Sequence, residues 1–158
     1  MSRITANIVK IFSFSFYECR IFTQSWFLYL KWDLLISFFN YKYWQSHLGY
    51  SSLLNGHSNK QTITPVFLHK IIQLNEKAGR NHFRKMNCLR RCLCQKEQLS
   101  NIGLICSLHL GVKFVEGKLA AHSWLSLNGE VINDSPDVIS TYEELVNLTE
   151  AKALSLFK

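Results

Sequence analysis

The segment KLAAHSWLSLNGEVIND, residues 118–134, contains the pattern that decides the fold. Asn128-Gly129 separates two runs rich in apolar and β-branched residues, which is a strong signal for a hairpin. The run before it, LICSLHLGVKF at residues 104–114, alternates in character and predicts another strand. Pro136 is expected to end the last strand. These runs predict an antiparallel meander of about three strands.

Two helices are predicted upstream of the meander. Residues 64–79 begin with Thr64 as a plausible N-cap and Pro65 at the first helical position. Residues 88–102 follow Asn87, another good N-cap residue, and repeat apolar positions at steps of three and four.

A further helix is expected downstream, over residues 141–157. Thr141 would be its N-cap and Glu144 its capping-box partner. Helices, then an antiparallel meander, then a helix is the element order of an α+β fold.

The 158 residues suit one domain, or one domain with an appended segment. We predict an aromatic-rich helical segment at 1–62 and the main domain at 63–158. Within the segment, residues 8–44 are too interrupted by charge for a transmembrane helix. Helical spacing relates Phe27, Leu30, Leu34, Leu35 and Phe38. Such a helix packs on the domain, docks a partner or lies on a membrane surface.

Charge is unevenly distributed along the chain. The net charge is +7, and residues 61–113 carry nine Lys/Arg against two Asp/Glu. The simplest interpretation is a solvated helix face, and the alternative is a surface for an acidic peptide or protein. No nucleic-acid-binding motif accompanies the basic residues, so we expect no nucleic acid partner.

The five cysteines indicate reduced thiols in a cytoplasmic protein. They are an odd number, and Cys92 and Cys94 are too close on one helix to bridge comfortably. A zinc site is the rival interpretation, with ligands drawn from the set Cys88, Cys92, Cys94, Cys106, His109 and His122. The spacing is irregular for structural zinc, so we expect neither a metal nor another cofactor.

Cys88 is the candidate nucleophile because it opens the helix after Asn87. Free N–H groups and positive potential at a helix start favour a thiolate. Its own backbone N–H is a candidate oxyanion donor, with Asn87 and Gln95 as possible second donors. Cys92, one turn further on, is interpreted as a packing residue.

The register expected for the hairpin suggests a function for His122 and Asp134. A three-residue loop, 127–129, would place His122 opposite Asp134 on one face of the sheet. Asp134 would then accept the Nδ1 proton of His122 and orient the other ring nitrogen toward Cys88. A two-residue turn would instead pair Asp134 with Ser123, on the other face. The proposed triad is therefore Cys88 as nucleophile, His122 as base and Asp134 as its orienting carboxylate, an arrangement like that of papain.

Four short motifs resemble one enzyme family. They are Cys88-Leu89 at the helix start, Leu108-His109-Leu110-Gly111-Val112, Ala121-His122-Ser123-Trp124, and Val131-Ile132-Asn133-Asp134-Ser135-Pro136. In this combination the stretch Cys88–Asp137 resembles the transglutaminase-like leader peptidase of lasso-peptide biosynthesis, the B component of those pathways.

The resemblance implies a transglutaminase-like cysteine peptidase fold and the triad Cys88, His122 and Asp134. It also implies removal of the leader from a ribosomally made precursor peptide, before a separate ATP-dependent cyclase closes the macrolactam. Family members often have Ser-Leu or Ala-Leu where this chain has Cys92-Leu93. No β-rich recognition module is evident at the N-terminus. The stand-alone form would therefore need a leader-recognition protein as a partner. A non-catalytic peptide-binding adaptor and a transglutaminase-like acyl transferase remain the alternatives.

Overall fold

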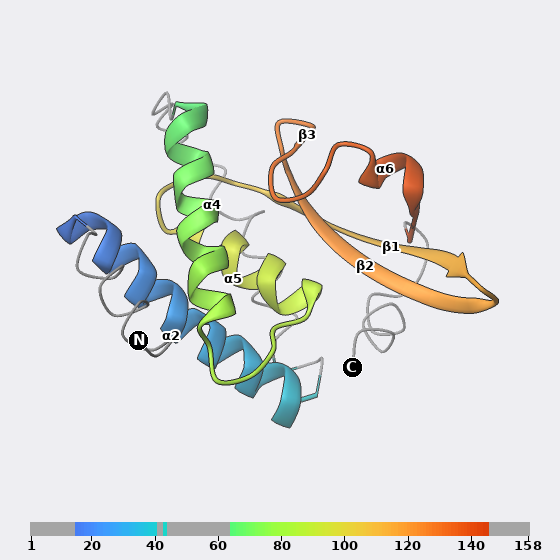
Figure 1. The fold of residues 1–158 in the computed structure, drawn as a ribbon, viewed down its shortest axis with the longest axis horizontal. Coiled ribbons are helices and arrows are strands. Elements are labelled where there is room, and N and C mark those ends of the chain that lie inside the picture. Colours follow the sequence, from blue (N-terminus) through green and yellow to red (C-terminus); the bar gives the residue numbers. More distant parts are fainter. Residues whose placement is uncertain (1–14, 41–42, 44–63, 146–158) are drawn as a thin grey trace, which may run out of the picture.

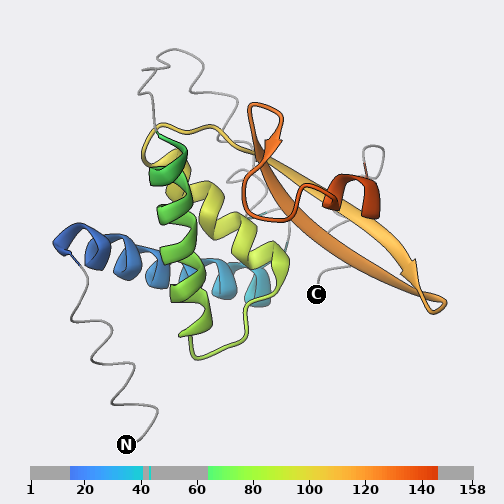
Figure 2. The ribbon, with the colours of Figure 1, turned by 45° about the horizontal axis from the view of Figure 1, so that its top comes forward.

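The computed structural model describes residues 15–40, 43 and 64–145. The described elements are α2 (Phe16–Phe38), α4 (Pro65–Arg80), α5 (Cys88–Ser100), β1 (Ser107–Val115), β2 (Lys118–Leu127), β3 (Glu130–Val131), α6 (Val138–Thr141) and β4 (Glu143–Glu144). α2, α4 and α5 gather at one end of the β1–β2 hairpin, whose turn projects away from them (Figure 1). The same arrangement is seen after a 45° rotation (Figure 2). The α+β class predicted from the sequence is confirmed. The predicted domain boundary at residues 62–63 lies outside the described residues.

Local capping explains where the helices begin. Ser15 and Glu18 form a capping box at the start of α2, with the Ser15 N–H donating to Glu18 Oε2 at 2.6 Å. Thr64 caps α4, and Asn87 caps α5 through a 3.0 Å hydrogen bond from the Arg90 N–H. Both of these caps were predicted from the sequence.

α2 packs on α4 and α5, but not through the apolar stripe expected from its sequence. Its buried residues are Ile21, Ser25, Leu28, Tyr29, Trp32, Asp33 and Ile36. Phe27, Leu34 and Phe38 of the expected stripe are instead 60%, 43% and 73% exposed. Large apolar side chains occur on every side of the helix, so periodicity alone does not identify the face that packs. Among the described residues, no helix combines the length and apolar character needed to cross a membrane.

A buried polar network joins the three large helices. The Tyr29 hydroxyl donates to Asn75 Oδ1 at 2.7 Å, and Asn75 Nδ2 donates to Gln98 Oε1 at 2.7 Å. Tyr29 also lies against Gly79, where an added Cβ would come within 2.9 Å of the tyrosine ring. These contacts fix how α2, α4 and α5 pack together, because buried polar groups need their partners.

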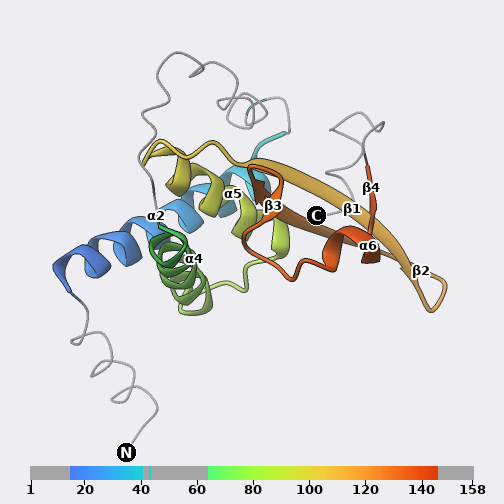
Figure 3. The ribbon, with the colours of Figure 1, turned by 90° about the horizontal axis from the view of Figure 1, so that it is seen from above.

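Seen from above, α4 is viewed nearly end-on and α2 runs past it alongside α5, while β1 and β2 extend away from these three helices (Figure 3). The sheet has four strands in the order β3-β2-β1-β4, and each pair is antiparallel. β4 is the strand that the sequence analysis did not expect.

The expected helix over residues 141–157 is not formed at its start. Thr141 ends the short helix α6 rather than capping a new one, and Glu143–Glu144 pair with Val112 and Gly111 as β4. The open edge of β1 and the 2.6 Å contact between His109 Nδ1 and Glu144 Oε1 favour this pairing. Residues 146–158 lie outside the described residues.

The register predicted for the second hairpin is also wrong. Leu127 pairs with Glu130 and Ser126 with Val131, so the turn is the two residues Asn128-Gly129. Both have positive φ, 53° and 88°, as in a type I′ turn, whose twist matches the flanking strands. The last backbone hydrogen bond between the two arms runs from the Ile132 N–H to the Leu125 carbonyl, at 3.0 Å, so the pairing ends before it reaches Asp134.

Candidate functional site

Cys88 is the first residue of α5, and its thiol is free and half-buried. Asp33 of α2 forms ion pairs that hold the start of this helix in place. That carboxylate is only 2% exposed and accepts from Arg90 Nε at 2.8 Å and from an Arg84 terminal nitrogen at 2.9 Å. The capped helix start at Cys88 was predicted from the sequence, whereas its ion pairs with α2 were not.

His122 lies on β2 directly opposite Gly111 of β1. Its ring stacks on Tyr142, with centroids 5.0 Å apart, and on Trp124 at 6.4 Å. A Cβ on Gly111 would come within 2.8 Å of Trp124 and 2.9 Å of Tyr142. The glycine therefore allows the two aromatic rings that flank His122 to approach the sheet closely.

Asp134 contacts His122, but through a different ring nitrogen and by a different route than predicted. Asp134 Oδ2 lies 2.6 Å from His122 Nε2, whereas the sequence analysis assigned the contact to Nδ1. The two side chains are 33% and 25% exposed. None of the hydrogen bonds among the described residues joins Cys88 to His122, although α5 packs against β2.

Asn133 explains how Asp134 reaches His122 without the predicted register. Its Oδ1 accepts from the Leu125 N–H at 2.8 Å, where a continuing strand would have supplied a backbone carbonyl. Its Nδ2 donates to Gln95 Oε1 at 2.7 Å and to Cys92 Sγ at 3.3 Å. The bend after β3 is thus tied both to β2 and to α5. This orients the next residue, Asp134, toward the histidine.

Comparison with known proteins relates this chain to an enzyme superfamily. The sequence profile of the transglutaminase-like superfamily matches residues 41–147. The chain belongs to the transglutaminase-like superfamily. Neither the curated proteins nor the solved structures contain a significant match.

The matched region of this transglutaminase-like chain contains α4, α5 and the whole sheet, and α2 precedes it. α2 nevertheless supplies Tyr29 and Trp32, which are 0% and 2% exposed, to the core cluster under α5. The helix that carries Cys88 therefore depends on residues outside the matched region.

The other cysteines near the site are buried. Cys92 is 2% exposed and its thiol donates to the Ser123 carbonyl at 3.2 Å. Burial raises the pKa of the Cys92 thiol to about 12 and that of Cys106 to about 11, and it also raises the pKa of Cys94. Cys92 is thus a packing residue, as predicted.

The candidate zinc ligands are not gathered in one place. His109 Nδ1 contacts Glu144 and its Nε2 lies 2.7 Å from Ser126 Oγ, at the sheet edge. Among residues 15–40, 43 and 64–145, no three His, Cys, Asp or Glu side chains are placed to share a metal ion.

Gln95 is not available as an oxyanion donor. It is 1% exposed, its Nε2 donates to Glu76 Oε1 at 2.6 Å, and its Oε1 accepts from Asn133. Gln95 instead supports the bend before Asp134. The part that Asn133 plays in holding this bend was not predicted from the sequence. Its position beside Asp134, at the end of a predicted strand, could have indicated it.

Proposed function

We propose that this transglutaminase-like chain is a cysteine peptidase that removes the leader from a ribosomally made precursor peptide. The contact between His122 of β2 and Asp134, on the sheet against which α5, the helix that begins at Cys88, packs, carries the proposal. A carboxylate on one ring nitrogen fixes the orientation and tautomer of the imidazole. It also stabilises the imidazolium that forms when the ring takes a proton.

The proposed reaction has two stages. His122 takes the thiol proton as the Cys88 sulfur bonds to the scissile carbonyl carbon, whose π electrons move to oxygen. The C–N bond then breaks, and His122 returns the proton to the leaving amine. Water next attacks the thioester and gives a proton to His122. The C–S bond breaks and His122 gives its proton to the departing sulfur, so that a carboxylic acid and the free thiol result.

Two features of the site support these roles. The backbone N–H of Cys88 is one of the free donors at the start of α5, and it is our candidate for the oxyanion of the intermediate. The contact of His122 Nε2 with Asp134 leaves Nδ1 as the nitrogen proposed to exchange the proton with Cys88.

The resemblance of the four motifs supports the leader peptide as substrate. A leader-recognition protein and an ATP-dependent cyclase are the proposed partners. The test incubates the purified protein with precursor peptides encoded near its gene, with and without a candidate recognition protein. Mass spectrometry of the product is the readout. We expect a hydrolysed peptide, and we expect Cys88→Ala to abolish it while Cys19→Ala, a cysteine on α2, retains it.

Three other outcomes of this experiment would each change the proposed function or mechanism. An amine-linked product would replace peptidase by acyl transferase, because an amine would have taken the place of water in the second stage. Binding of the precursor without any product would favour the adaptor. Cleavage by Cys88→Ala at the wild-type rate would remove this residue from the mechanism.

A further inference from the structure

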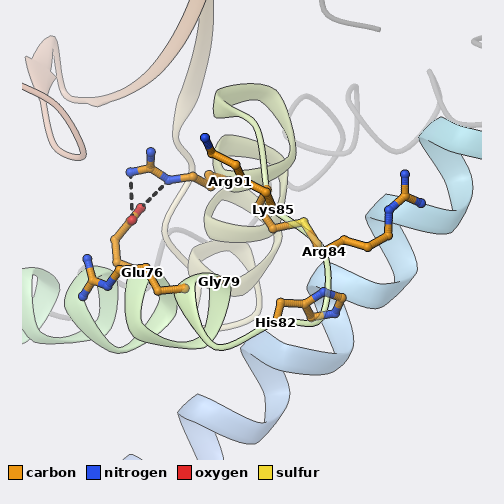
Figure 4. A pocket seen from close by; sticks show the side chains of 8 residues that line it. Glu76, Gly79, His82, Arg84, Lys85 and Arg91 are labelled. Carbon is orange, nitrogen blue, oxygen red and sulfur yellow. Dashed lines mark hydrogen bonds and ion pairs between the residues drawn. The ribbon is translucent and has the colours of Figure 1, made fainter. Parts of the chain in front are cut away.

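Two hollows lie along α4 and adjoin each other. The first, of about 710 Å³, separates α4 from residues 131–134 and includes Asp134 in its lining. The second, of about 500 Å³, lies between the end of α4 and the start of α5 (Figure 4). Glu76 and Arg80 line both. We call the combined depression the α4 trench.

The α4 trench contacts one residue of the proposed triad and extends to the first turn of α5, which begins at Cys88. Asp134 lines it directly on the sheet side. On the helix side Arg91 lines it, three residues after Cys88 on α5. A chain lying in the trench is therefore close to the bond that the centre would cleave.

Cations outnumber carboxylates along the trench, and the carboxylates are already paired. Glu18 contacts Lys70 at 2.8 Å, Glu76 contacts Arg91 at 2.8 Å, and Asp134 contacts His122. The remaining lining cations are Lys77, Arg80, Arg84 and Lys85, of which Arg84 pairs with Asp33.

Arg80 and Lys85 have no carboxylate within 4 Å in the described part of the chain, and both are exposed. In Figure 4, Lys85 extends toward the Arg91–Glu76 side while Arg84 extends the other way, toward α2. The second hollow thus presents unneutralised positive charge beside the start of α5.

His82, which also lines the second hollow, adds no charge at neutral pH. Its ring lies 4.9 Å from the Trp26 ring and 4.2 Å from that of Phe83, between centroids. Burial lowers its pKa from the usual 6.5, so the imidazole is neutral. Attraction of an anion to the trench therefore depends on the arginine and lysine side chains.

The walls favour a peptide over a nucleic acid. Single-stranded nucleic acids bind where aromatic side chains stack on the bases. The described residues that line the trench include apolar side chains such as Ile72 and Ile132 but no Phe, Tyr or Trp. From His69 to Arg80 the wall runs for roughly 17 Å of helix, enough for about five residues of an extended peptide.

We propose that the α4 trench binds an acidic segment of the peptide substrate next to the cleaved bond, with Arg80 and Lys85 contacting its carboxylates. The proposal deepens the proposed peptidase function and rests on it. It names a substrate class: a precursor with Asp or Glu residues beside the cleavage site.

The test measures binding to full-length Cys88→Ala protein, in which no turnover occurs. Fluorescence anisotropy follows two labelled eight-residue peptides, one with four Asp/Glu and a matched one with Asn/Gln, together with an eight-nucleotide oligothymidine. We expect the acidic peptide to bind most tightly and to weaken as salt is raised. The double variant Arg80→Gln/Lys85→Gln should weaken it roughly tenfold, as expected for two exposed charge contacts.

The matched control is Arg20→Gln/Lys118→Gln, which removes two exposed cations that do not line the trench. Circular dichroism checks that all variants fold. The trench assignment would be overturned if the control variant lost as much affinity for the acidic peptide as Arg80→Gln/Lys85→Gln does. It would also be overturned if the Asn/Gln peptide bound as tightly as the acidic one, or if the acidic peptide did not bind. Tighter binding of oligothymidine would replace the peptide by a nucleic acid. Because the readout is binding, failure of the proposed cleavage reaction leaves this result separately interpretable.

Discussion

Asn133→Ala tests how the bend after β3 is held. The substitution removes the side chain that joins β2 to α5 and that precedes the proposed orienting carboxylate Asp134. We expect a loss of stability together with a loss of the contact between His122 and Asp134.

The size of the expected loss in unfolding free energy follows from the two buried groups that lose their hydrogen-bond partner. The Leu125 N–H and the Gln95 Oε1 belong to residues that are 0% and 1% exposed. A buried polar group left unpaired costs about 1–3 kcal/mol, and water can reach the Gln95 amide once the half-buried Asn133 is truncated. The expected loss is therefore about 2–3 kcal/mol. For a chain of this size that lowers Tm by roughly 8 °C.

Two measurements are needed. Urea unfolding gives the free energy, and proton NMR follows the imidazole N–H resonance of His122 that the short contact with Asp134 shifts downfield. Ser135→Ala is the control, because it changes an exposed side chain of the same bend whose hydroxyl has no hydrogen bond among the described residues.

The reasoning is refuted if Asn133→Ala and Ser135→Ala unfold at the same urea concentration. If Asn133→Ala is destabilised but the His122 resonance is unchanged, Asn133 supports the fold without positioning Asp134.

Three further predictions follow from the structure. Gly111→Ala should cost about 1–3 kcal/mol by urea unfolding, because its Cβ would overlap Trp124; an unchanged midpoint would contradict this. Iodoacetamide at pH 8 should modify Cys88 and leave the buried Cys92 unmodified, as read by peptide mapping. Hydrogen bonds from Lys70 of α4 and from the N-cap residue Ser15 lower the pKa of Glu18 to about 2. The stability that ionised Glu18 gives the fold is therefore complete above pH 4.5 and is lost as the pH falls toward 2. Glu18→Gln should flatten this fall in unfolding free energy, as measured by urea unfolding at each pH.

Local sequence located the helix caps and the hairpin turn, although it did not give the length of the turn and hence the register. Thr64 and Asn87 were identified as helix caps because a cap needs only a side-chain oxygen beside the free N–H groups of its own helix. Asn128-Gly129 located the hairpin for the same reason, since only these two residues must adopt positive φ.

Features that depend on distant residues were predicted less well. The packing face of α2 was predicted wrongly. Apolar side chains surround this helix, and the face that packs is the one whose Tyr29 and Ser25 find partners in Asn75 and Gln98 of α4 and α5. The start of the expected C-terminal helix was wrong as well, because Glu143–Glu144 pair with an edge strand some thirty residues away.

The sequence by itself determined the α+β class, the helix start at Cys88 and the position of the turn between His122 and Asp134. Only the tertiary structure decided how these two side chains meet. The ladder ends after two pairs, and Asp134 is turned toward His122 Nε2 by Asn133, whose partners come from both β2 and α5. A hydrogen-bond register is local to a hairpin, whereas a side-chain bridge of this kind exists only once the helix has packed against the sheet.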